Sequence, residues 1–277
     1  MKKSLINRGI LAVTLTIIAL TALNAQNNKS GNGFVPEVGQ QGKDVVWVPT
    51  PQELVDKMLE IAGVTPDDYV IDLGSGDGRT VISAAKLGAN ALGVEYNPDM
   101  VALSKRNAQK EGVSDKAKFI EADLFETDLS KATVITMFLL PEINLRLRPK
   151  LLELKPGTRI VSNTFTMGEW EADYEVTTED NWNSWNHALM WIVPAKVDGK
   201  WRLDKGEFNL SQNYQFVSGT LTNNGKNAAL TEGRLKGSEI TFTIDGTVYT
   251  GKVDGSKMSG TFVTGSTKGS WSAVKIN

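Results

Sequence analysis

Acidic side chains follow three predicted strands of this chain at the point where each strand ends. The first strand leads into "VIDLGSGDGR", in which glycines alternate with other residues between Asp72 and Arg79. The second, "ALGVE", closes on Glu95, and the third, "FIEAD", closes on Asp123. Glycines let the backbone approach a ligand closely, and carboxylates suit a cationic, amine-bearing ligand. The pattern predicts a site for such a ligand, although each carboxylate alone also fits a cap, an ion pair or a turn.

The glycine-rich loop also resembles, loosely, the G-x-G-x-x-G fingerprint of dinucleotide-binding proteins. Its spacing differs, because Arg79 stands where the third glycine is expected. Asp72 and Asp77 would also lie where a pyrophosphate needs neutral or positive surroundings. A dehydrogenase with a dinucleotide cofactor is therefore disfavoured.

Strand-like and helix-like patterns alternate from about residue 44 to residue 195. The first helix begins with a capping-box pattern, Thr50 and Glu53, with Pro51 at the first helical position. Alternation of this kind predicts an α/β fold with a doubly wound, mostly parallel sheet and helices on both faces. Ligands of such sheets bind beyond the carboxyl ends of the strands, where the acidic residues lie. Strands are expected at residues 69–73, 91–95, 118–122, 133–140 and 159–165.

Residues 196–277 follow a different pattern. Short alternating runs are separated by Asp-Gly and Asn-Gly pairs, which favour tight hairpin turns. We predict a small antiparallel β module, a barrel or a sandwich, with a role in binding or capping. The preceding cluster "NWNSWNHALMWIVP" is interpreted as the last hairpin of the predicted α/β sheet, with His187 in a structural role. Stacking of its tryptophans, Trp182, Trp185 and Trp191, on sugars or methylammonium groups is the alternative.

Composition limits the classes of protein further. The formal net charge is -2, so the chain lacks the excess of basic residues that is typical of nucleic-acid-binding proteins. The chain has no cysteine and one histidine, which excludes disulfides and a zinc site of several imidazoles, and we predict no metal.

The N-terminus is typical of an exported protein. Lys2, Lys3 and Arg8 precede the apolar run "GILAVTLTIIALTALNA". We predict a signal peptide or membrane anchor over residues 1–25 and a linker over residues 26–43. The body is then expected to be periplasmic or envelope-associated, and cytoplasmic if the signal is not used.

Taken together, these motifs resemble the class I S-adenosylmethionine-dependent methyltransferases. In that family the first motif reads much like "VIDLGSGDGR", the acidic residue at the second strand end takes the two ribose hydroxyls, and the third strand end reads the adenine amino group. The resemblance implies S-adenosyl-L-methionine as the cofactor. It assigns cofactor contacts to Thr50, Asp72, Gly74, Ser75, Gly76, Asp77, Glu95, Asn97, Asp123 and Leu124.

A finer resemblance covers about residues 45–171. The segments "WVPTPQELVDKML" and "ATVITMFLLPEINLRLRPKLLELKPGTRIVSNTFTMGEW" look like the protein-lysine methyltransferase subgroup that includes the ATP synthase c-subunit lysine methyltransferases and archaeal enzymes. The subgroup pattern places Trp47, Pro49 and Thr50 in an entry flap over the cofactor. Two departures concern the acceptor: Phe138 replaces a common tyrosine, and "SNTF" stands where a histidine-containing "SH-x-F" is expected.

The resemblance implies N-methylation of a protein lysine by in-line transfer, which depends on alignment rather than on acid–base groups. A dry pocket favours the neutral amine of the acceptor. We expect Phe138, Leu140, Pro141 and Asn144 to form one wall for the acceptor, with Asn163 and Phe165 opposite. Core strand positions are the alternative for each of these residues.

Two other functions stay open at this point. One is a non-catalytic binding or scaffold protein that retains the fold, and the other is a small-molecule methyltransferase. The expected partner is a methyl-acceptor protein or a small molecule, with membrane contact only through the N-terminus.

Overall fold

The structure, a computed structural model, describes residues 33–179 and 185–276. The predicted signal peptide or anchor, residues 1–25, lies outside the described residues. Contacts divide the chain into residues 1–37 and a compact unit of residues 38–277. No helix in the described ranges is long and apolar enough to cross a membrane.

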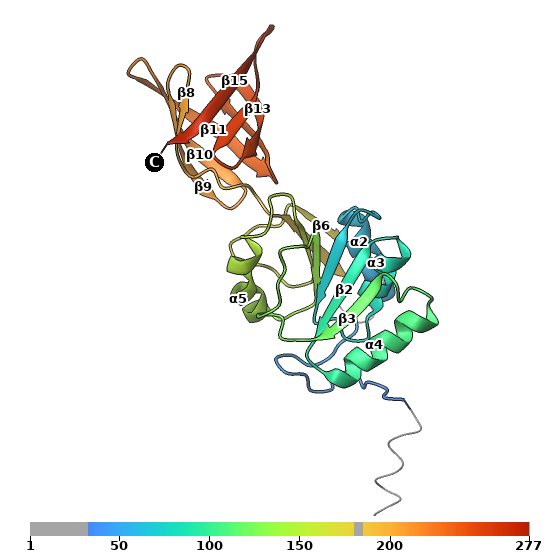
Figure 1. The fold of residues 1–277 in the computed structure, drawn as a ribbon. Helices are drawn as coiled ribbons and strands as arrows, with labels where there is room; N and C mark the ends of the chain where they lie inside the picture. The colour runs from blue at the N-terminus through green and yellow to red at the C-terminus, as the bar shows by residue number, and fades with distance from the viewer. Residues whose placement is uncertain (1–32, 180–184, 277) are drawn as a thin grey trace, which may run out of the picture. The chain divides into compact units, whose positions relative to one another are not determined.

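The first part of the compact unit is an α/β domain built on a seven-stranded sheet, as the alternating pattern predicts (Figure 1). Its strand order is β3-β2-β1-β4-β5-β7-β6. The pairs from β3 to β5 are parallel, and β7 and β6 add an antiparallel hairpin at one edge. The strands are β1 (Tyr69–Leu73), β2 (Asn90–Glu95), β3 (Ala117–Glu121), β4 (Val134–Met137), β5 (Arg159–Asn163), β6 (Tyr174–Thr177) and β7 (His187–Ile192).

Helices cover both faces of this sheet. The helices are α2 (Gln52–Ile61), α3 (Arg79–Lys86), α4 (Pro98–Lys110) and α5 (Pro141–Leu151). Apolar residues of α2, α3 and α4 pack in one buried cluster with Val70 and Val134 of the sheet. Those of α5 pack in a second cluster with Ile71 and Ile135, because successive strand residues point to opposite faces. The doubly wound arrangement is thereby confirmed.

The predicted capping box at the first helix is wrong. Pro51 is the N-cap of α2, and no side chain caps the helix. Thr50 makes other bonds, because its carbonyl accepts from Arg79 Nη1 at 2.8 Å and its hydroxyl accepts from Asn163 Nδ2 at 3.2 Å. These bonds tie the start of α2 to α3 and to the end of β5.

Two strands end earlier than expected, at Met137 and Asn163. Phe138 and Phe165 therefore follow the carboxyl ends of β4 and β5 rather than lying inside them. Thr164 has φ of 62°, a left-handed conformation that is strained for a β-branched residue. The strained turn redirects the chain at the edge where ligands of such sheets bind.

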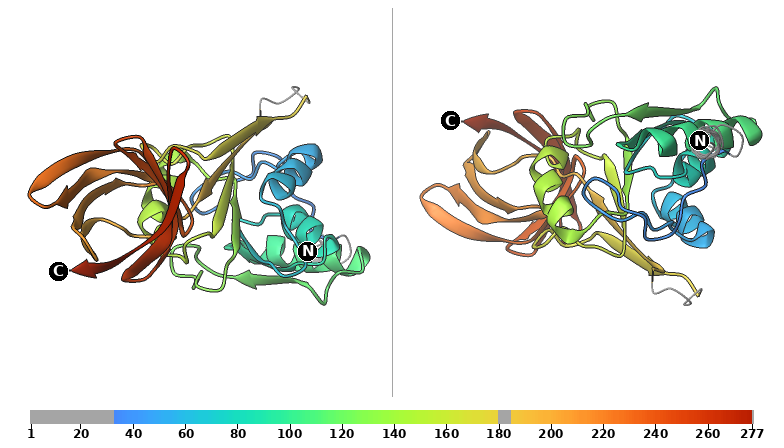
Figure 2. Two further views of the ribbon diagram at one scale, coloured as in Figure 1. Left: turned by 90° about the horizontal axis from the view of Figure 1, so that it is seen from above. Right: turned by 90° about the horizontal axis from the view of Figure 1, so that it is seen from below.

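The C-terminal part is a closed antiparallel barrel, which confirms the predicted all-β module (Figure 2). Its eight strands are β8 (Gly199–Leu203), β9 (Glu207–Asn213), β10 (Phe216–Asn223), β11 (Lys226–Lys236), β12 (Glu239–Ile244), β13 (Thr247–Asp254), β14 (Lys257–Thr264) and β15 (Thr267–Ile276). The interior is filled by aromatic side chains, including Trp201, Phe208, Phe242 and Trp271. Burial of this kind makes the barrel a packed core rather than a ligand cavity.

Candidate active site

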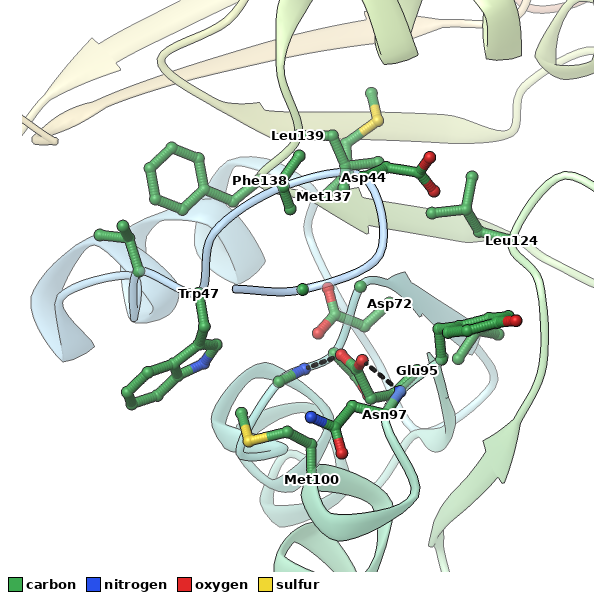
Figure 3. A pocket seen from close by; sticks show the side chains of 18 of the residues that line it. Asp44, Trp47, Asp72, Glu95, Asn97, Met100, Leu124, Met137, Phe138 and Leu139 are labelled. Atoms are coloured by element: carbon green, nitrogen blue, oxygen red, sulfur yellow. Dashed lines mark hydrogen bonds between the residues drawn. The ribbon is translucent and has the colours of Figure 1, made fainter. Parts of the chain in front are cut away.

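A cavity of about 400 Å³ opens at the carboxyl ends of β1, β2 and β4. Figure 3 shows Asp72, Glu95 and Asn97 facing it, with the loop that carries Asp44 and Trp47 beside them. The lining includes all predicted cofactor contacts, namely Thr50, Asp72, Gly74, Ser75, Gly76, Asp77, Glu95, Asn97, Asp123 and Leu124. Segments distant in sequence thus meet around one space.

Glycine is required in the loop after β1 for two reasons. Gly74, Gly76 and Gly78 have φ of 77°, 54° and 84°, which other L-residues rarely adopt. A Cβ on Gly76 would also lie 2.6 Å from the indole nitrogen of Trp47, and a Cβ on Gly78 would lie 2.8 Å from the ring of Phe119. The loop therefore lets Trp47 close over the backbone at the cavity wall.

Asp72 is a buried carboxylate at the end of β1. Burial, with a smaller contribution from the nearby charges of Glu95 and Asp77, raises its pKa to about 7, although the hydrogen bond from the hydroxyl of Thr136 acts in the lowering direction. That hydroxyl donates to Asp72 Oδ1 at 2.7 Å. Within the described part of the chain no cation forms an ion pair with Asp72. A positively charged ligand in the cavity would supply the missing partner.

Glu95 connects the glycine loop to the start of α4. Its Oε2 accepts the backbone N–H of Gly76 at 3.0 Å, and its Oε1 accepts that of Asn97 at 2.9 Å (Figure 3). Asn97 in turn caps α4 by accepting from the N–H of Asp99 at 2.9 Å. Each carboxylate oxygen retains an acceptor site for a ligand hydroxyl.

Replacing Glu95 with glutamine is expected to weaken cofactor binding by about 10- to 100-fold, because one acceptor becomes an amide donor facing a backbone N–H. Isothermal titration with the cofactor measures the loss. Glu121→Gln is the matched control, since Glu121 pairs with Glu95 across β2 and β3 but does not line the cavity. Equal affinities for the two variants would contradict the role of Glu95.

Residues 39–47 form a tight hairpin at the mouth of the cavity. The N–H of Gly39 donates to Trp47 O at 2.8 Å, and the N–H of Trp47 donates to Gln40 O at 2.9 Å. At the tip, Lys43 Nζ donates to Asp123 Oδ2 at 2.5 Å and lies 4.5 Å from the centre of the Tyr96 ring. Lys43 lowers the pKa of the Asp123 carboxyl through this bond. The flap thus includes the predicted Trp47 and extends further toward the N-terminus.

Aromatic rings form the other end of the cavity. The rings of Phe138 and Phe165 are 5.9 Å apart, and Trp185 lies 5.4 Å from the first and 5.8 Å from the second. Met137 and Leu139 line the cavity beside them. None of these five side chains is ionisable, so this end is apolar.

The other predicted acceptor residues lie behind that wall rather than in the cavity lining, except Leu140. Asn144 is buried and its Nδ2 donates to the carbonyls of Phe165 and Thr166 at 3.3 and 3.2 Å. Asn163 is buried and donates to Thr50. Pro141 begins α5. Asn144 thereby holds the segment that carries Phe165, and Asn163 ties the end of β5 to Thr50, while neither asparagine lines the cavity.

The remaining aromatic candidates are distributed between the cavity and the core. Trp185 lines the cavity, whereas Trp191 is buried and donates to Trp170 O at 2.7 Å. His187 lies in β7, 3.5 Å from a carboxylate oxygen of Glu175 and outside the cavity lining. Trp182 lies outside the described residues. Tyr96 and Met100 also line the cavity, and no sequence motif had singled them out.

Known proteins share this domain. A family model described as the ANTKMT methyltransferase domain matches residues 72–174. The protein-lysine N-methyltransferase of Saccharolobus islandicus is 46% identical over 152 residues, which make up 54% of this chain and 93% of that enzyme. The chain belongs to the family of this archaeal methyltransferase.

Two further relatives agree with this assignment. The lysine N-methyltransferase of Rattus norvegicus that is named for the ATP synthase c-subunit is 39% identical over 51% of this chain, which spans 59% of the rat enzyme. A crystal structure described as an RNA methyltransferase from Salinibacter ruber with S-adenosyl-L-homocysteine is 46% identical. Its TM-score is 0.51, and the match covers 54% of this chain and 96% of that one. The chain is an S-adenosylmethionine-dependent methyltransferase, as its sequence motifs predict.

The cavity of this methyltransferase fits the cofactor. Asp72 offers a buried negative charge for a positively charged group. Ser75 lines the cavity, and its buried hydroxyl has no hydrogen-bond partner among the described residues. Glu95 adds acceptors for hydroxyl groups beside them.

Proposed function

We propose that this methyltransferase N-methylates a lysine side chain of a protein. The observation that carries the proposal is the apolar end of the cavity, made by Met137, Leu139 and the three rings of Phe138, Phe165 and Trp185. An apolar wall disfavours the charged form of an amine and so favours a neutral lysine. The names of the archaeal and rat relatives support the same acceptor.

The residues of the chain then divide into two groups. Asp72 would hold the positively charged amine of the cofactor, Glu95 its ribose hydroxyls, and Asp123 with Leu124 its adenine. S-adenosylmethionine supplies a methyl group on a positively charged sulfur. Phe138, Phe165 and Trp185 would align the lysine Nζ in line with the bond that breaks and exclude water from it.

Methyl transfer to a neutral lysine needs no catalytic base. The lone pair of Nζ forms the new N–C bond, the electrons of the C–S bond remain on sulfur, and the amine proton leaves to solvent. Cation–π contact with the rings would stabilise the positive charge on nitrogen. RNA is a less suitable acceptor, because a formal net charge of -2 does not favour a polyanion.

The test incubates the full chain with labelled S-adenosylmethionine and, separately, a mixed protein lysate, total RNA and small amines. Label in protein, mapped to lysine by mass spectrometry, is the expected result. Label confined to RNA or to small molecules would assign a different acceptor, and absence of turnover with measurable cofactor binding would favour a scaffold.

Phe165→Ala is expected to lower kcat/KM for the acceptor by about 10-fold or more, because a ring of the wall is lost. Cofactor affinity should stay within about 2-fold, since the ring contacts of Phe165 are with Phe138 and Trp185 rather than with Asp72 or Glu95. Phe125→Ala is the control, because Phe125 follows the third strand end but does not line the cavity. A normal acceptor kcat/KM in the Phe165 variant would argue against the aromatic wall as the acceptor site.

We also propose export through residues 1–25, as a cleaved signal or an uncleaved anchor, which would bring the enzyme to envelope proteins. The basic head and apolar run support it. Cell fractionation with N-terminal sequencing tests it: a mature start near residue 26, or an intact chain in the membrane fraction, is expected. An intact chain in the cytoplasmic fraction would contradict export.

A further inference from the structure

The barrel is the part of the chain that the methyltransferase family does not explain. The family match ends at residue 174, before β8 begins at Gly199. The match with the archaeal enzyme already uses 93% of that protein, which leaves no room there for such a barrel. Residues 38–277 nevertheless form one compact unit, so the barrel contacts the α/β domain.

The turn between β9 and β10 makes the most unusual of these contacts. Its two residues are Tyr214 and Gln215, and Tyr214 has φ of 53°. Tight hairpin turns use glycine, asparagine or aspartate at such positions, because a large side chain is strained there. The other tight turns of the barrel include Asn224-Gly225 and Asp245-Gly246, which follow that rule.

Burial indicates why this turn departs from the rule. Gln215 is fully buried, although turn residues normally face solvent, and its Nε2 donates to the carbonyl of Glu171 at 2.8 Å. The ring of Tyr214 stacks on Trp170 with centroids 5.9 Å apart and planes at 12°. The turn is therefore inserted into the α/β domain, against residues 170–171.

The segment that receives the turn also carries Phe165 of the acceptor wall. Asn144 and Arg148 lie four positions apart in α5, and so on one face of it. Asn144 holds the carbonyls of Phe165 and Thr166, and Arg148 Nη1 donates to Met167 O at 2.8 Å. The guanidinium of Arg148 lies 5.6 Å from the centre of the Tyr214 ring. Tyr214 thus contacts both Trp170 at the end of the segment and the arginine that holds its middle.

Further contacts fix the barrel on both sides of this turn. Arg234 Nη2 donates to Asp173 Oδ1 at 2.9 Å, and that carboxylate is 5% exposed. Gln212 accepts from the N–H of Val197 at 2.7 Å and donates to Ala195 O at 2.9 Å, which ties the connecting segment to β9. Hydrogen bonds therefore hold the segment between β7 and β8 against the barrel.

We propose that the barrel is a positioning domain for the acceptor wall and that Tyr214 is its positioning residue. The aromatic ring is kept at a strained turn position because it orders residues 165–170, and hence Phe165, against α5. Only the kinetic part of the test, the kcat/KM for the acceptor, rests on the proposed lysine methylation. The structural part, hydrogen exchange of the segment that carries Phe165, does not depend on the substrate.

The test replaces Tyr214 with glycine, which relieves the turn strain and removes the ring. Asn224→Gly is the matched control, because Asn224 has φ of 50° at an exposed turn of the same barrel. Tyr214→Phe retains the stack and should restore wild-type behaviour. All variants are compared as full chains with the cofactor bound.

Hydrogen exchange at residues 164–172 is expected to rise at least about 10-fold in Tyr214→Gly and to stay unchanged in the other two variants. Acceptor kcat/KM should fall about 10-fold through kcat, with cofactor Kd within about 2-fold. Unchanged exchange at residues 164–172 in Tyr214→Gly would overturn the positioning role. If the wild type methylates no lysine, the proposed function fails, while the exchange result still decides the role of Tyr214.

Discussion

Asp72→Asn is expected to abolish cofactor binding and, at the same time, to stabilise the cofactor-free protein. The loss of affinity should be about 100-fold or more, because a buried charge partner for a cationic group is removed. The gain in stability follows from the pKa of Asp72, which burial raises to about 7. Folding at pH 8 leaves a charged carboxylate in the interior, and a neutral asparagine avoids that cost.

The sign of the stability change follows from proton linkage. The folded pKa of Asp72 lies above its unfolded value of 3.8, so its ionisation destabilises the fold progressively as pH rises from about 4 to 7. At pH 8 the full cost is present. We expect Asp72→Asn to raise the free energy of unfolding by on the order of 2 kcal/mol, and the melting temperature by roughly 5 °C.

Asp68→Asn is the matched control, for which we expect a change of the opposite sign in the free energy of unfolding. Asp68 is a buried carboxylate that accepts from the backbone N–H of Thr65 at 2.8 Å and pairs with Arg159. Hydrogen bonds from Thr133 and Thr65 and the charge of Arg159 lower its pKa despite burial. Its replacement should therefore destabilise the protein at pH 8 and leave cofactor binding unchanged. Destabilisation by Asp72→Asn, or retained cofactor affinity, would contradict the account of Asp72.

The grouping of the predicted cofactor residues around one cavity could be predicted because each of them follows a recognisable local pattern. Asp72, Glu95 and Asp123 each follow a strand in the sequence, and parallel strands bring their carboxyl ends to one edge. The glycines of the first loop are needed because their φ angles are positive, a conformation that other residues rarely adopt. Sheet topology then assembles residues that are separate in the sequence.

The acceptor side was less predictable because it depends on contacts between distant residues. Asn163 was expected in the wall, yet it bonds Thr50, which is 113 positions away, and lies outside the cavity lining. Phe138 was placed in a strand, but the strand ends at Met137. Packing decides where a strand ends, and apolar runs such as "TMFLLP" do not encode that point.

The docking of the barrel had no signal in the sequence. Asn-Gly and Asp-Gly pairs correctly predicted the hairpin turns at residues 224–225, 245–246 and 254–255, but Asp198-Gly199, also expected to form a turn, lies at the start of β8. Tyr214 and Gln215 form a turn without turn residues. A local rule is broken there because a tertiary contact with Trp170 compensates for it. Departures of this kind indicate functional or interface positions only after the structure is known.

Cofactor affinity is expected to fall about 30-fold between pH 8 and pH 5.5. Asp72 binds a cationic group only when ionised, and its pKa of about 7 means that most of the carboxyl is protonated at pH 5.5. The affinity should therefore level off near pH 8 and decrease about 10-fold per pH unit well below 7. Isothermal titration with S-adenosyl-L-homocysteine, whose amine keeps a positive charge, measures the profile.

The hydroxyl of Thr136 provides the sharpest control for this assignment. It donates to Asp72 and lowers the pKa of that carboxyl, so Thr136→Val should move the midpoint of the affinity profile to higher pH without changing its shape. A ligand with the same adenosine portion but no amine should bind with little pH dependence, since it has no charge to offer Asp72. A midpoint that stays in place in Thr136→Val, with the protein folded, would assign the titration to another group and leave Asp72 without its role in holding the amine.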